Sequence, residues 1–361
     1  MAFSSNGYIM LPPMNFYQRS FTIECWIYLT NLTSNILPLI GQCFYIKIMN
    51  NNTILRFGFG HDDVDSSVVL DVFQWYHLAF VYDYSTRKRS IYINGISQNT
   101  IVSDSTASHL FLGQSQHFTI GKIESFDDLF VGYIDHLSVT HRAKSSNEIL
   151  NDATLVAYYS FDCGSIFDGS MNLLSATAPA TSTVAGKMNE GLKFNSSSAS
   201  LKVSRLTSLG YTNRSFSFAF WMKPAQTIGS LIFVSNETSG TGWCSTMLGF
   251  NTSGYITAQV SGGVIVGPKP PLNVWTHVAY TYSVENGINL YINGTFYAST
   301  GGNIGRETPN MSLYLVVANQ ILSGFACYLA YMSNMPFSGV LDELRIYNRE
   351  ISASEVCMLA S

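Results

Sequence analysis

The amino-acid sequence predicts an all-β protein built from two copies of one domain. The first observation is a pattern written twice: W-Y-H-L-A-F-V-Y followed by I-Y-I-N-G within 75–95, and W-T-H-V-A-Y-T-Y followed by L-Y-I-N-G within 275–294. The second is the Asn-Gly pair that ends each pattern, because both residues tolerate the positive φ angles of a tight hairpin turn. The third is the composition, with 47% hydrophobic, 14% aromatic and only 12% charged residues, which is typical of aromatic-rich β proteins.

The repeat extends outward from these hairpins in both directions. S-F-T-I-E-C-W at 20–26 matches S-F-S-F-A-F-W at 215–221, and G-Y-I-D-H-L-S-V at 132–139 matches G-V-L-D-E-L-R-I at 339–346. The offset between the copies grows from 195 to 207 along the chain, as small loop insertions between preserved strands would produce. A period of this length is a domain duplication, and it predicts domains at 1–152 and 153–361.

Each copy is predicted to close with a short helix. Ser145 with Glu148, and Ser352 with Glu355, have the spacing of a capping box, in which each side chain satisfies a backbone N–H of the first helical turn. The second copy begins with an additional strand at 155–161 that has no counterpart in the first. The first domain is therefore predicted to be incomplete.

Taken together, the order of these motifs resembles the laminin-G-like domains of the concanavalin A-like superfamily. The resemblance covers nearly the whole chain, twice. It implies two tandem antiparallel jelly-roll β-sandwiches. It does not imply one function, because this fold hosts lectins, adhesion modules, protein binders and glucanases.

The sequons and cysteines predict a secreted glycoprotein. An even number of cysteines accompanies eight Asn-x-Ser/Thr sequons, a combination typical of the secretory pathway. The alternative is that Asn, Ser and Thr are simply abundant in loops. The sequons begin at Asn31, Asn51, Asn195, Asn213, Asn236, Asn251, Asn293 and Asn310, and a glycan on Asn293 would project from a hairpin tip.

The sequence gives little support for a membrane span or for binding to nucleic acid. No signal peptide is visible, so we expect that a leader was removed or that the sequence is an excerpt. No uninterrupted apolar run of membrane-spanning length occurs. The formal net charge of −4 gives no electrostatic case for nucleic acid or an anionic membrane.

Cysteine positions suggest disulfides in both domains. Cys25 and Cys43 flank a plausible hairpin and are predicted to pair, the alternative being two buried free thiols. The four cysteines of the second domain allow three connectivities. The favoured pairs are Cys163–Cys357, which would tie the additional strand to the closing helix, and Cys244–Cys327, between two loops.

Catalysis is not predicted. The resemblance implies that a glucanase of this superfamily would carry alternating acids on one strand, and no such array occurs. Glu124 and Asp127 are three residues apart, which on a strand places them on opposite faces. His77 and His277 lie within predicted buried strands, where a core histidine is the expected role.

Calcium is a candidate cofactor, because the resemblance implies rim sites made of aspartates and backbone carbonyls. The candidate ligands in a loop of the first domain are Asp62, Asp63 and Asp65. Asp135 and Asp342 recur at matching positions of the closing strand. Their preferred role is structural, as acceptors of backbone hydrogen bonds at the strand start, and metal binding is the alternative.

Glycan binding is suggested by aromatic side chains in loops, because sugar rings stack on Trp and Tyr beside a few polar groups. Trp243 has no counterpart in the first copy and lies outside any strand pattern. Tyr328 and Tyr331 lie in another loop of the same domain. The alternative is that these side chains cover the end of the sandwich.

These observations predict a non-catalytic extracellular adhesion or matrix module that contacts glycan or protein. The alternative is a self-assembling subunit of a fibre or coat. In that case the incomplete first domain would expose a strand edge that a neighbouring copy completes. A glycoside hydrolase is the least favoured of the three classes.

Overall fold

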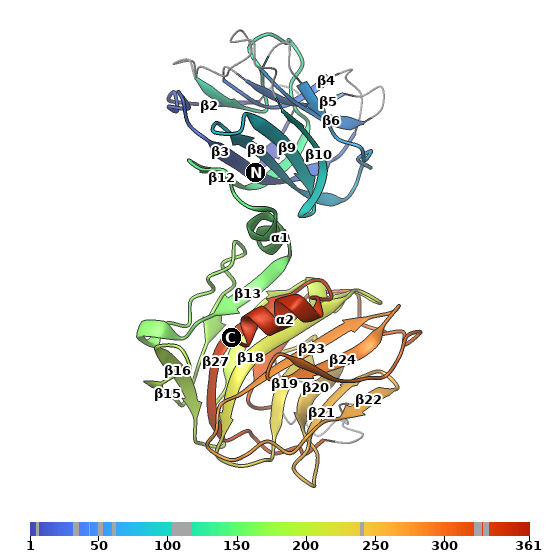
Figure 1. Cartoon of the computed structure of the whole chain (residues 1–361). Helices are drawn as coiled ribbons and strands as arrows, with labels where there is room; N and C mark the ends of the chain where they lie inside the picture. The colour runs from blue at the N-terminus through green and yellow to red at the C-terminus, as the bar shows by residue number, and fades with distance from the viewer. Residues whose placement is uncertain are drawn as a thin grey trace. The chain divides into compact units, whose positions relative to one another are not determined.

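The protein folds into two compact units, Met1–Thr154 and Leu155–Ser361. The computed structural model describes every residue except 5–6, 32–35, 43, 50–52, 60–62, 103–116, 239–241, 321–326 and 328–331. Each unit is a sandwich of two antiparallel sheets with one short α-helix (Figure 1). The predicted all-β class is confirmed.

Unit 1 contains two six-stranded sheets. Their strand orders are β1-β12-β3-β8-β9-β10 and β2-β11-β4-β5-β6-β7. Its elements are β1 (Ala2–Phe3), β2 (Ile9–Leu11), β3 (Phe21–Leu29), β4 (Ile36–Gly41), β5 (Tyr45–Met49), β6 (Ile54–Gly58), β7 (Asp63–Asp65), β8 (Trp75–Asp83), β9 (Lys88–Ile93), β10 (Ile96–Val102), β11 (Phe118–Ile120), β12 (Gly132–Thr140) and α1 (Ser146–Thr154).

Unit 2 contains an eight-stranded and a seven-stranded sheet. The first has the order β15-β16-β27-β18-β23-β24-β25 with β13 also paired to β27, and the second has the order β14-β17-β26-β19-β20-β21-β22. Its elements are β13 (Leu155–Tyr159), the 3-10 helix η2 (Asp162–Gly164), β14 (Ala176–Thr177), β15 (Thr181–Ala185), β16 (Glu190–Phe194), β17 (Leu201–Leu206), the 3-10 helix η3 (Ser208–Gly210), β18 (Phe216–Pro224), β19 (Ser230–Ser235), β20 (Cys244–Phe250), β21 (Ile256–Val260), β22 (Gly263–Val266), β23 (Thr276–Ser283), β24 (Gly287–Ile292), β25 (Thr295–Ser299), β26 (Leu313–Val317), β27 (Gly339–Tyr347) and α2 (Ala353–Leu359).

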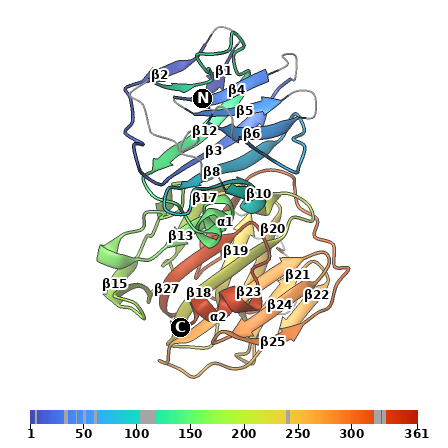
Figure 2. The same ribbon diagram turned by 45° about the horizontal axis from the view of Figure 1, so that its top comes forward.

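The two units have the same strand order when β16 and β17 are matched with β1 and β2. Unit 2 adds β13, β14 and β15 ahead of this shared set, and β13 and β15 are strands of its larger sheet (Figure 2). The outer edge of β27 therefore pairs with both β16 and β13. Among the described residues, the outer edge of β12 pairs only with β1.

The predicted Asn-Gly turns join β9 to β10 and β24 to β25. Asn94 and Gly95 have φ values of 51° and 80°, and the second pair has 49° and 78°. Each turn lies beneath the closing helix of its unit: a Cβ added to Gly95 would lie 2.8 Å from the Cα of Leu150 in α1. Glycine is required there both for its positive φ and for this close approach.

The core of each unit lies between its two sheets. Alternation along β3 directs Phe21, Ile23, Cys25 and Ile27 inward, and all four are buried in the unit 1 core. Full burial of one such aromatic or aliphatic side chain contributes about 1.5–3 kcal/mol. In unit 2 the same face of β18 begins with Phe216, whose ring stacks on Tyr282 at 5.2 Å.

Both predicted capping boxes form. The Ser352 hydroxyl accepts from the Glu355 backbone N–H, and the Glu355 carboxylate accepts from the Ser352 backbone N–H. Ser145 and Glu148 make the same reciprocal pair in unit 1.

The cysteines follow the predictions only in part. The Cys244–Cys327 disulfide forms, closing a sequence separation of 83 residues. The predicted Cys163–Cys357 bond is wrong, because both thiols are exposed and free. Cys163 lies in η2 beside β16, whereas α2 contacts β25 at the other edge of the sheet. Those two strands are five strand spacings apart, about 24 Å, and a disulfide spans less than 7 Å between Cα atoms.

The remaining cysteine prediction concerns Cys25 and Cys43. Cys25 is a free thiol in the unit 1 core, where burial raises its pKa to about 12. Its predicted partner Cys43 lies outside the described residues.

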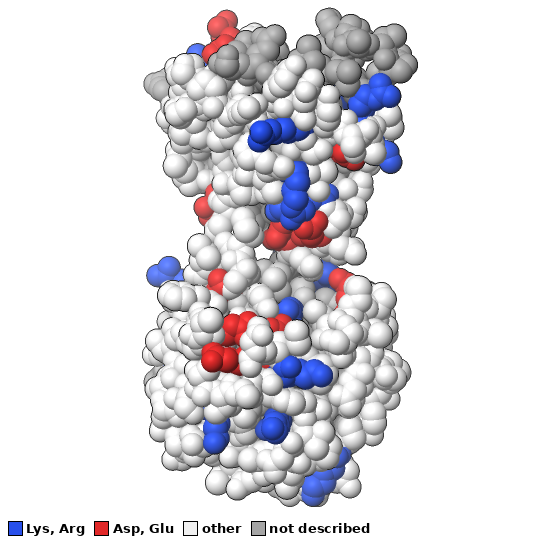
Figure 3. All heavy atoms as spheres, turned by 60° about the vertical axis from the view of Figure 1, so that its left-hand side comes forward, with Lys and Arg blue, Asp and Glu red and all other residues white. Residues whose placement is uncertain are grey.

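Charged side chains are sparse on the face of the molecule that Figure 3 shows. On the face shown in Figure 3, basic and acidic residues occur in small separate groups, and uncharged residues cover most of each unit. Within the described parts of the chain, neither helix has the length and apolar character needed to cross a bilayer.

Candidate functional site

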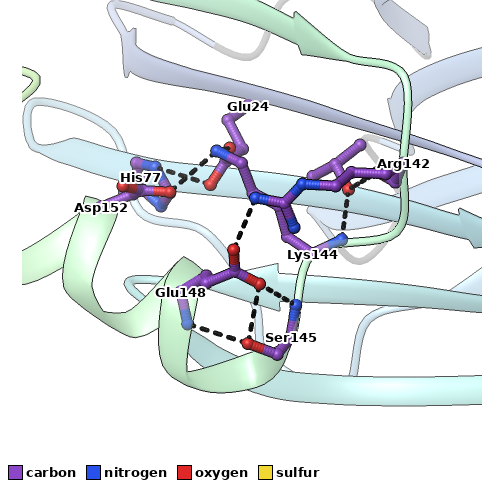
Figure 4. Close-up of polar contacts among 8 residues, drawn as sticks. Glu24, His77, Arg142, Lys144, Ser145, Glu148 and Asp152 are labelled. Atoms are coloured by element: carbon purple, nitrogen blue, oxygen red, sulfur yellow. Dashed lines mark hydrogen bonds and ion pairs between the residues drawn. The ribbon is translucent and has the colours of Figure 1, made fainter.

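A cluster of charges lies beneath helix α1 of unit 1 (Figure 4). Lys144, just before the helix, donates hydrogen bonds from Nζ to Glu24 Oε2 on β3 and to Asp152 Oδ2 in α1, the latter at 2.8 Å. Glu24 is only 1% exposed. His77 on β8 places Nε2 3.8 Å from Glu24 Oε1. The cluster therefore joins the helix to two strands of the sheet.

Burial sets the protonation of this cluster. It raises the pKa of Glu24, although the hydrogen bond and charge of Lys144 oppose the shift. Burial alone would lower the pKa of Lys144, but its hydrogen bonds to Asp152 and Glu24 outweigh that effect and raise it. Burial lowers the pKa of His77 to about 4, so this imidazole is neutral at pH 7. Because Glu24 is enclosed, the cluster suits fixing the helix better than reaction with a substrate.

Unit 2 shows that the fold does not require these charges. The positions that correspond to Glu24, Lys144 and Asp152 hold Ala219, Ile351 and Leu359. These three side chains pack in a small apolar cluster under α2. The same helix is thus held by ions in one unit and by apolar contacts in the other.

The two buried histidines are a feature shared by both units. His77 and His277 are 3% and 1% exposed, as their strand positions predict. Each ring meets a tryptophan of the neighbouring strand edge-on, Trp26 and Trp221 respectively, at 5.3 Å. Burial lowers the pKa of His277 to about 4 as well. Both histidines are structural.

The predicted acidic loop is wrong for Asp63 and Asp65, which lie in strand β7, and both of their carboxylates are paired with other side chains. Arg56 donates to both carboxylate oxygens of Asp65 at 2.7 Å, and the Tyr45 hydroxyl donates to Asp63 at 2.6 Å. Asp62 lies outside the described residues. Within the part of the chain that the structure describes, no three His, Cys, Asp or Glu side chains gather as a metal site requires. Calcium binding stays a prediction, and an ion at Asp63 and Asp65 would have to displace Arg56.

Asp135 and Asp342 occupy equivalent positions but have different surroundings. Asp342 is buried, and its Oδ2 accepts from the backbone N–H groups of Lys187 and Met188 at 2.7 and 2.9 Å. Burial raises its pKa to about 6, against the lowering effect of these donors. It thereby holds the turn between β15 and β16, and β15 has no counterpart among the described strands of unit 1. Asp135 is exposed and accepts from the backbone N–H of His136 at 3.0 Å.

Trp243, the predicted stacking residue, lines a cavity of about 210 Å³ in unit 2. The other walls include Met247, Gln259, Ser261 and Arg306. The Trp243 side chain is half-buried and packs against the apolar core. Tyr328 and Tyr331, predicted to lie near such a site, fall outside the described residues.

An exposed aromatic row in unit 1 was not predicted. Tyr133 on β12, Tyr28 on β3 and Trp75 on β8 are direct cross-strand neighbours. The ring centroid of Tyr28 lies 5.6 Å from that of Tyr133 and 5.5 Å from that of Trp75. Tyr133 and Trp75 are 43% and 45% exposed. Asp135 is two residues beyond Tyr133 on β12, so its side chain lies on the same face of the sheet.

The sequence contained one signal for this row. Tyr28 alternates with the core residues Ile27 and Leu29, which places it on the outer face of β3. Sequence alone does not state which strands flank β3, so the meeting of three rings could not be predicted. Unit 2 holds Lys223, Trp275 and Val340 in the corresponding places and has no such row.

The sequon asparagines that the structure describes are all at least partly exposed, and Asn51 lies outside the described residues. The Oδ1 atoms of Asn213 and Asn293 accept from the backbone N–H groups of Arg306 and His277. These hydrogen bonds involve Oδ1 only. They do not engage the side-chain amide nitrogen, to which a glycan would be attached. The Asn293 tip lies against α2, and a Cβ added to Gly294 would be 3.3 Å from Cys357 Cα.

Comparison with known proteins identifies one family for both units. The family model Laminin_G_3, described as the concanavalin A-like lectin/glucanases superfamily, matches residues 3–150 and 195–357. Adhesion G-protein coupled receptor D1 of Homo sapiens is 29% identical over 91 residues. That match spans 25% of this chain and 9% of the receptor.

Two solved structures resemble part of this chain. Domain 4 of an extracellular GH43 arabinanase from Geobacillus stearothermophilus, in complex with arabinotriose, is 22% identical with a TM-score of 0.43, over 57% of this chain and 98% of that domain. The binding domain of Paraclostridial Mosquitocidal Protein 1 is 21% identical with a TM-score of 0.43, over 58% of this chain and 52% of that one.

Proposed function

Because the chain belongs to the concanavalin A-like lectin/glucanases superfamily in both of its units, we propose that it is a non-catalytic extracellular binding module for glycans. The observation that carries the proposal is the exposed row Tyr133–Tyr28–Trp75. Three adjoining rings offer a continuous apolar platform on which sugar faces stack. The carboxylate of Asp135, one row along, is placed to accept from sugar hydroxyls.

Binding is favoured over hydrolysis by the state of the described acids. Glu24 is enclosed with Lys144, and Asp65 is paired with Arg56. Asp342 is occupied by backbone N–H groups. A glycosidase needs two carboxyl groups facing one accessible bond, about 5–10 Å apart.

An extracellular location is supported by the disulfide and the sequons. The Cys244–Cys327 bond persists best in an oxidising compartment. The described sequon asparagines are accessible to modification. Expression in a secreting eukaryotic host followed by peptide N-glycosidase should lower the apparent mass, and an unchanged mass would contradict the location.

A glycan array probed with the full chain tests the binding function. We expect defined glycans to bind, and Trp75→Ala and Tyr133→Ala each to weaken binding about 2- to 10-fold, the equivalent of roughly 0.5–1.5 kcal/mol per aromatic contact. Trp275→Ala, the matched position in unit 2, should leave that binding unchanged. An array without signal, or equal effects from all three variants, would overturn the proposal.

A second candidate is strand addition at unit 1, as in a self-assembling fibre or coat. Beyond Asp135, the outer edge of β12 lacks a partner strand among the described residues, whereas β13 pairs with the matching part of β27. A cavity of about 450 Å³ lies at that edge, lined by apolar side chains that include Phe3, Ile120 and Leu137. Sedimentation of the purified chain over a range of concentrations tests this candidate, and a monomer at every concentration would exclude it.

A further inference from the structure

The cavity beside Trp243 contains a buried arginine that forms no ion pair with the described residues. Arg306 is 4% exposed, and it lines the same cavity of about 210 Å³. Among the residues that the structure describes, neither Nη1 nor Nη2 of Arg306 has a hydrogen-bond partner. Buried charges in proteins are normally paired, and an unpaired guanidinium is costly to retain.

The backbone around this arginine is fixed. The Arg306 N–H donates to Asn213 Oδ1 at 2.8 Å, and its carbonyl accepts from the Asn213 N–H at 3.0 Å. The guanidinium carbon lies 5.2 Å from the centroid of the Phe216 ring. The side chain is therefore held in place by its neighbours and is prearranged for a ligand.

The groups around the guanidinium do not neutralise it. Burial lowers the pKa of Arg306, and the phenols that act on it, Tyr280 and Tyr282, donate their protons to the carbonyls of Gln259 and Ile304. An arginine stays protonated at neutral pH even so. Glu307 also lines the cavity, but its side chain is exposed and it makes no ion pair with Arg306 in the described structure.

We propose that this cavity binds the carboxylate of an acidic sugar, with Arg306 holding the carboxylate and Trp243 covering the ring. A guanidinium presents paired N–H donors that match a carboxylate in two parallel hydrogen bonds. The volume is below the roughly 300–1,000 Å³ of sites for drug-sized ligands, so it accommodates one monosaccharide residue. Gln259 and Ser261 add polar groups to the wall. The proposal rests on the chain being a glycan-binding module, but not on the aromatic row of unit 1.

The test compares ligands on the intact chain. Glucuronate, glucuronamide, glucose and acetate are titrated while the indole N–H resonance of Trp243, identified by its loss in Trp243→Phe, is followed by NMR. We expect glucuronate to shift this resonance and to bind at least about tenfold more tightly than glucuronamide, which lacks the charge. Equal affinities for the two would overturn the proposal, and so would acetate binding as well as glucuronate.

Variants then locate the charge. Arg306→Gln should reduce the affinity for glucuronate to that for glucuronamide. Arg214→Gln removes an exposed positive charge from the same unit and should change nothing. Retained glucuronate affinity in Arg306→Gln would refute the assignment. If Arg306→Gln fails to fold, the comparison of the two ligands on the unmodified chain decides.

The outcome is separable from that of the proposed function. No response of Trp243 to glucuronate, together with a positive glycan array lost in Trp75→Ala, would remove this site and leave the glycan-binding function standing. A glucuronate response together with a negative array would leave this site standing and would remove the aromatic row of unit 1 as a glycan-binding surface.

Discussion

Replacing Lys144 with methionine should destabilise unit 1 more than any other single charge removal in the described surface of that unit. The change deletes the cation but keeps most of the side-chain volume. Glu24 then remains 1% exposed with its carboxylate next to that of Asp152. Breaking a buried pair by removing one partner costs about 3–5 kcal/mol. The Lys144 and Asp152 side chains are 13% and 27% exposed, so solvent relieves part of this cost and we expect about 3 kcal/mol.

Unit 2 shows which apolar residues can take the place of the three charged ones. The triple variant Glu24→Ala, Lys144→Ile, Asp152→Leu copies the apolar set Ala219, Ile351 and Leu359 that packs under α2. Replacing a buried ion cluster by well-packed apolar side chains is often neutral or stabilising by about 1–4 kcal/mol. We therefore expect the triple variant to be at least as stable as the unmodified protein.

The pH dependence gives an independent readout for Lys144→Met. Without its cation, Glu24 has a folded-state pKa further above the 4.5 of an unperturbed glutamate. A protonated Glu24 carries no charge, so the loss of stability should be full at neutral pH. It should shrink as the pH falls through the folded-state pKa of Glu24.

Denaturant unfolding of the full chain measures these effects, with hydrogen exchange of the α1 and β3 peptides assigning the transition to unit 1. The assignment is needed because a chain of two units does not unfold in one step. Arg142→Met is the matched control, because the Arg142–Glu148 pair lies in solvent, where such ion pairs contribute little to stability. A loss below 1 kcal/mol in Lys144→Met, or an equal loss in the triple variant, would refute the reasoning.

Three further outcomes are expected. Replacing Cys244 and Cys327 by alanine should lower the stability of unit 2 by about 4.5 kcal/mol, the loop-closure entropy for a separation of 83 residues, as measured by thermal unfolding. The depressed pKa values of His77 and His277 predict that stability is full above pH 6.5 and is lost as the pH falls toward about 4, by about 3 kcal/mol for each histidine, measured as the midpoint of unfolding against pH. Asp342→Asn should speed amide exchange about tenfold at Glu343 or at Lys187 and Met188, because one amide oxygen cannot replace both Oδ1, which accepts from Glu343, and Oδ2, which accepts from the other two.

Each of these has a control in the same chain. Cys163→Ala removes a free exposed thiol and should not change the melting temperature. His277→Gln should flatten the acid-side slope by about half if the two histidines cause it. Asp135→Asn alters the exposed counterpart of Asp342 and should leave exchange in unit 1 unchanged. The opposite result in any control would contradict the corresponding prediction.

The sequence by itself determined the local structure of this protein. Alternation identified the core face of β3, and Asn-Gly identified the tips at 94–95 and 293–294. Ser-x-x-Glu identified both helix starts. Each of these features depends on residues within one strand, turn or helical end, so a linear pattern contains all the information needed.

The order of the strands in the sheets determined the contacts between residues that are distant in the sequence, which the sequence pattern could not predict. It placed Cys163 beside β16 and Cys357 beside the turn between β24 and β25, so the predicted disulfide cannot form. It brought Tyr133, Tyr28 and Trp75 together from three strands, and it enclosed Arg306 beside Trp243 from separate loops. These contacts join residues far apart in the chain, and their existence depends on which strands become neighbours. The duplicated sequence pattern predicts that both units share one fold. Where the surfaces of the two units differ can be seen only in the tertiary structure.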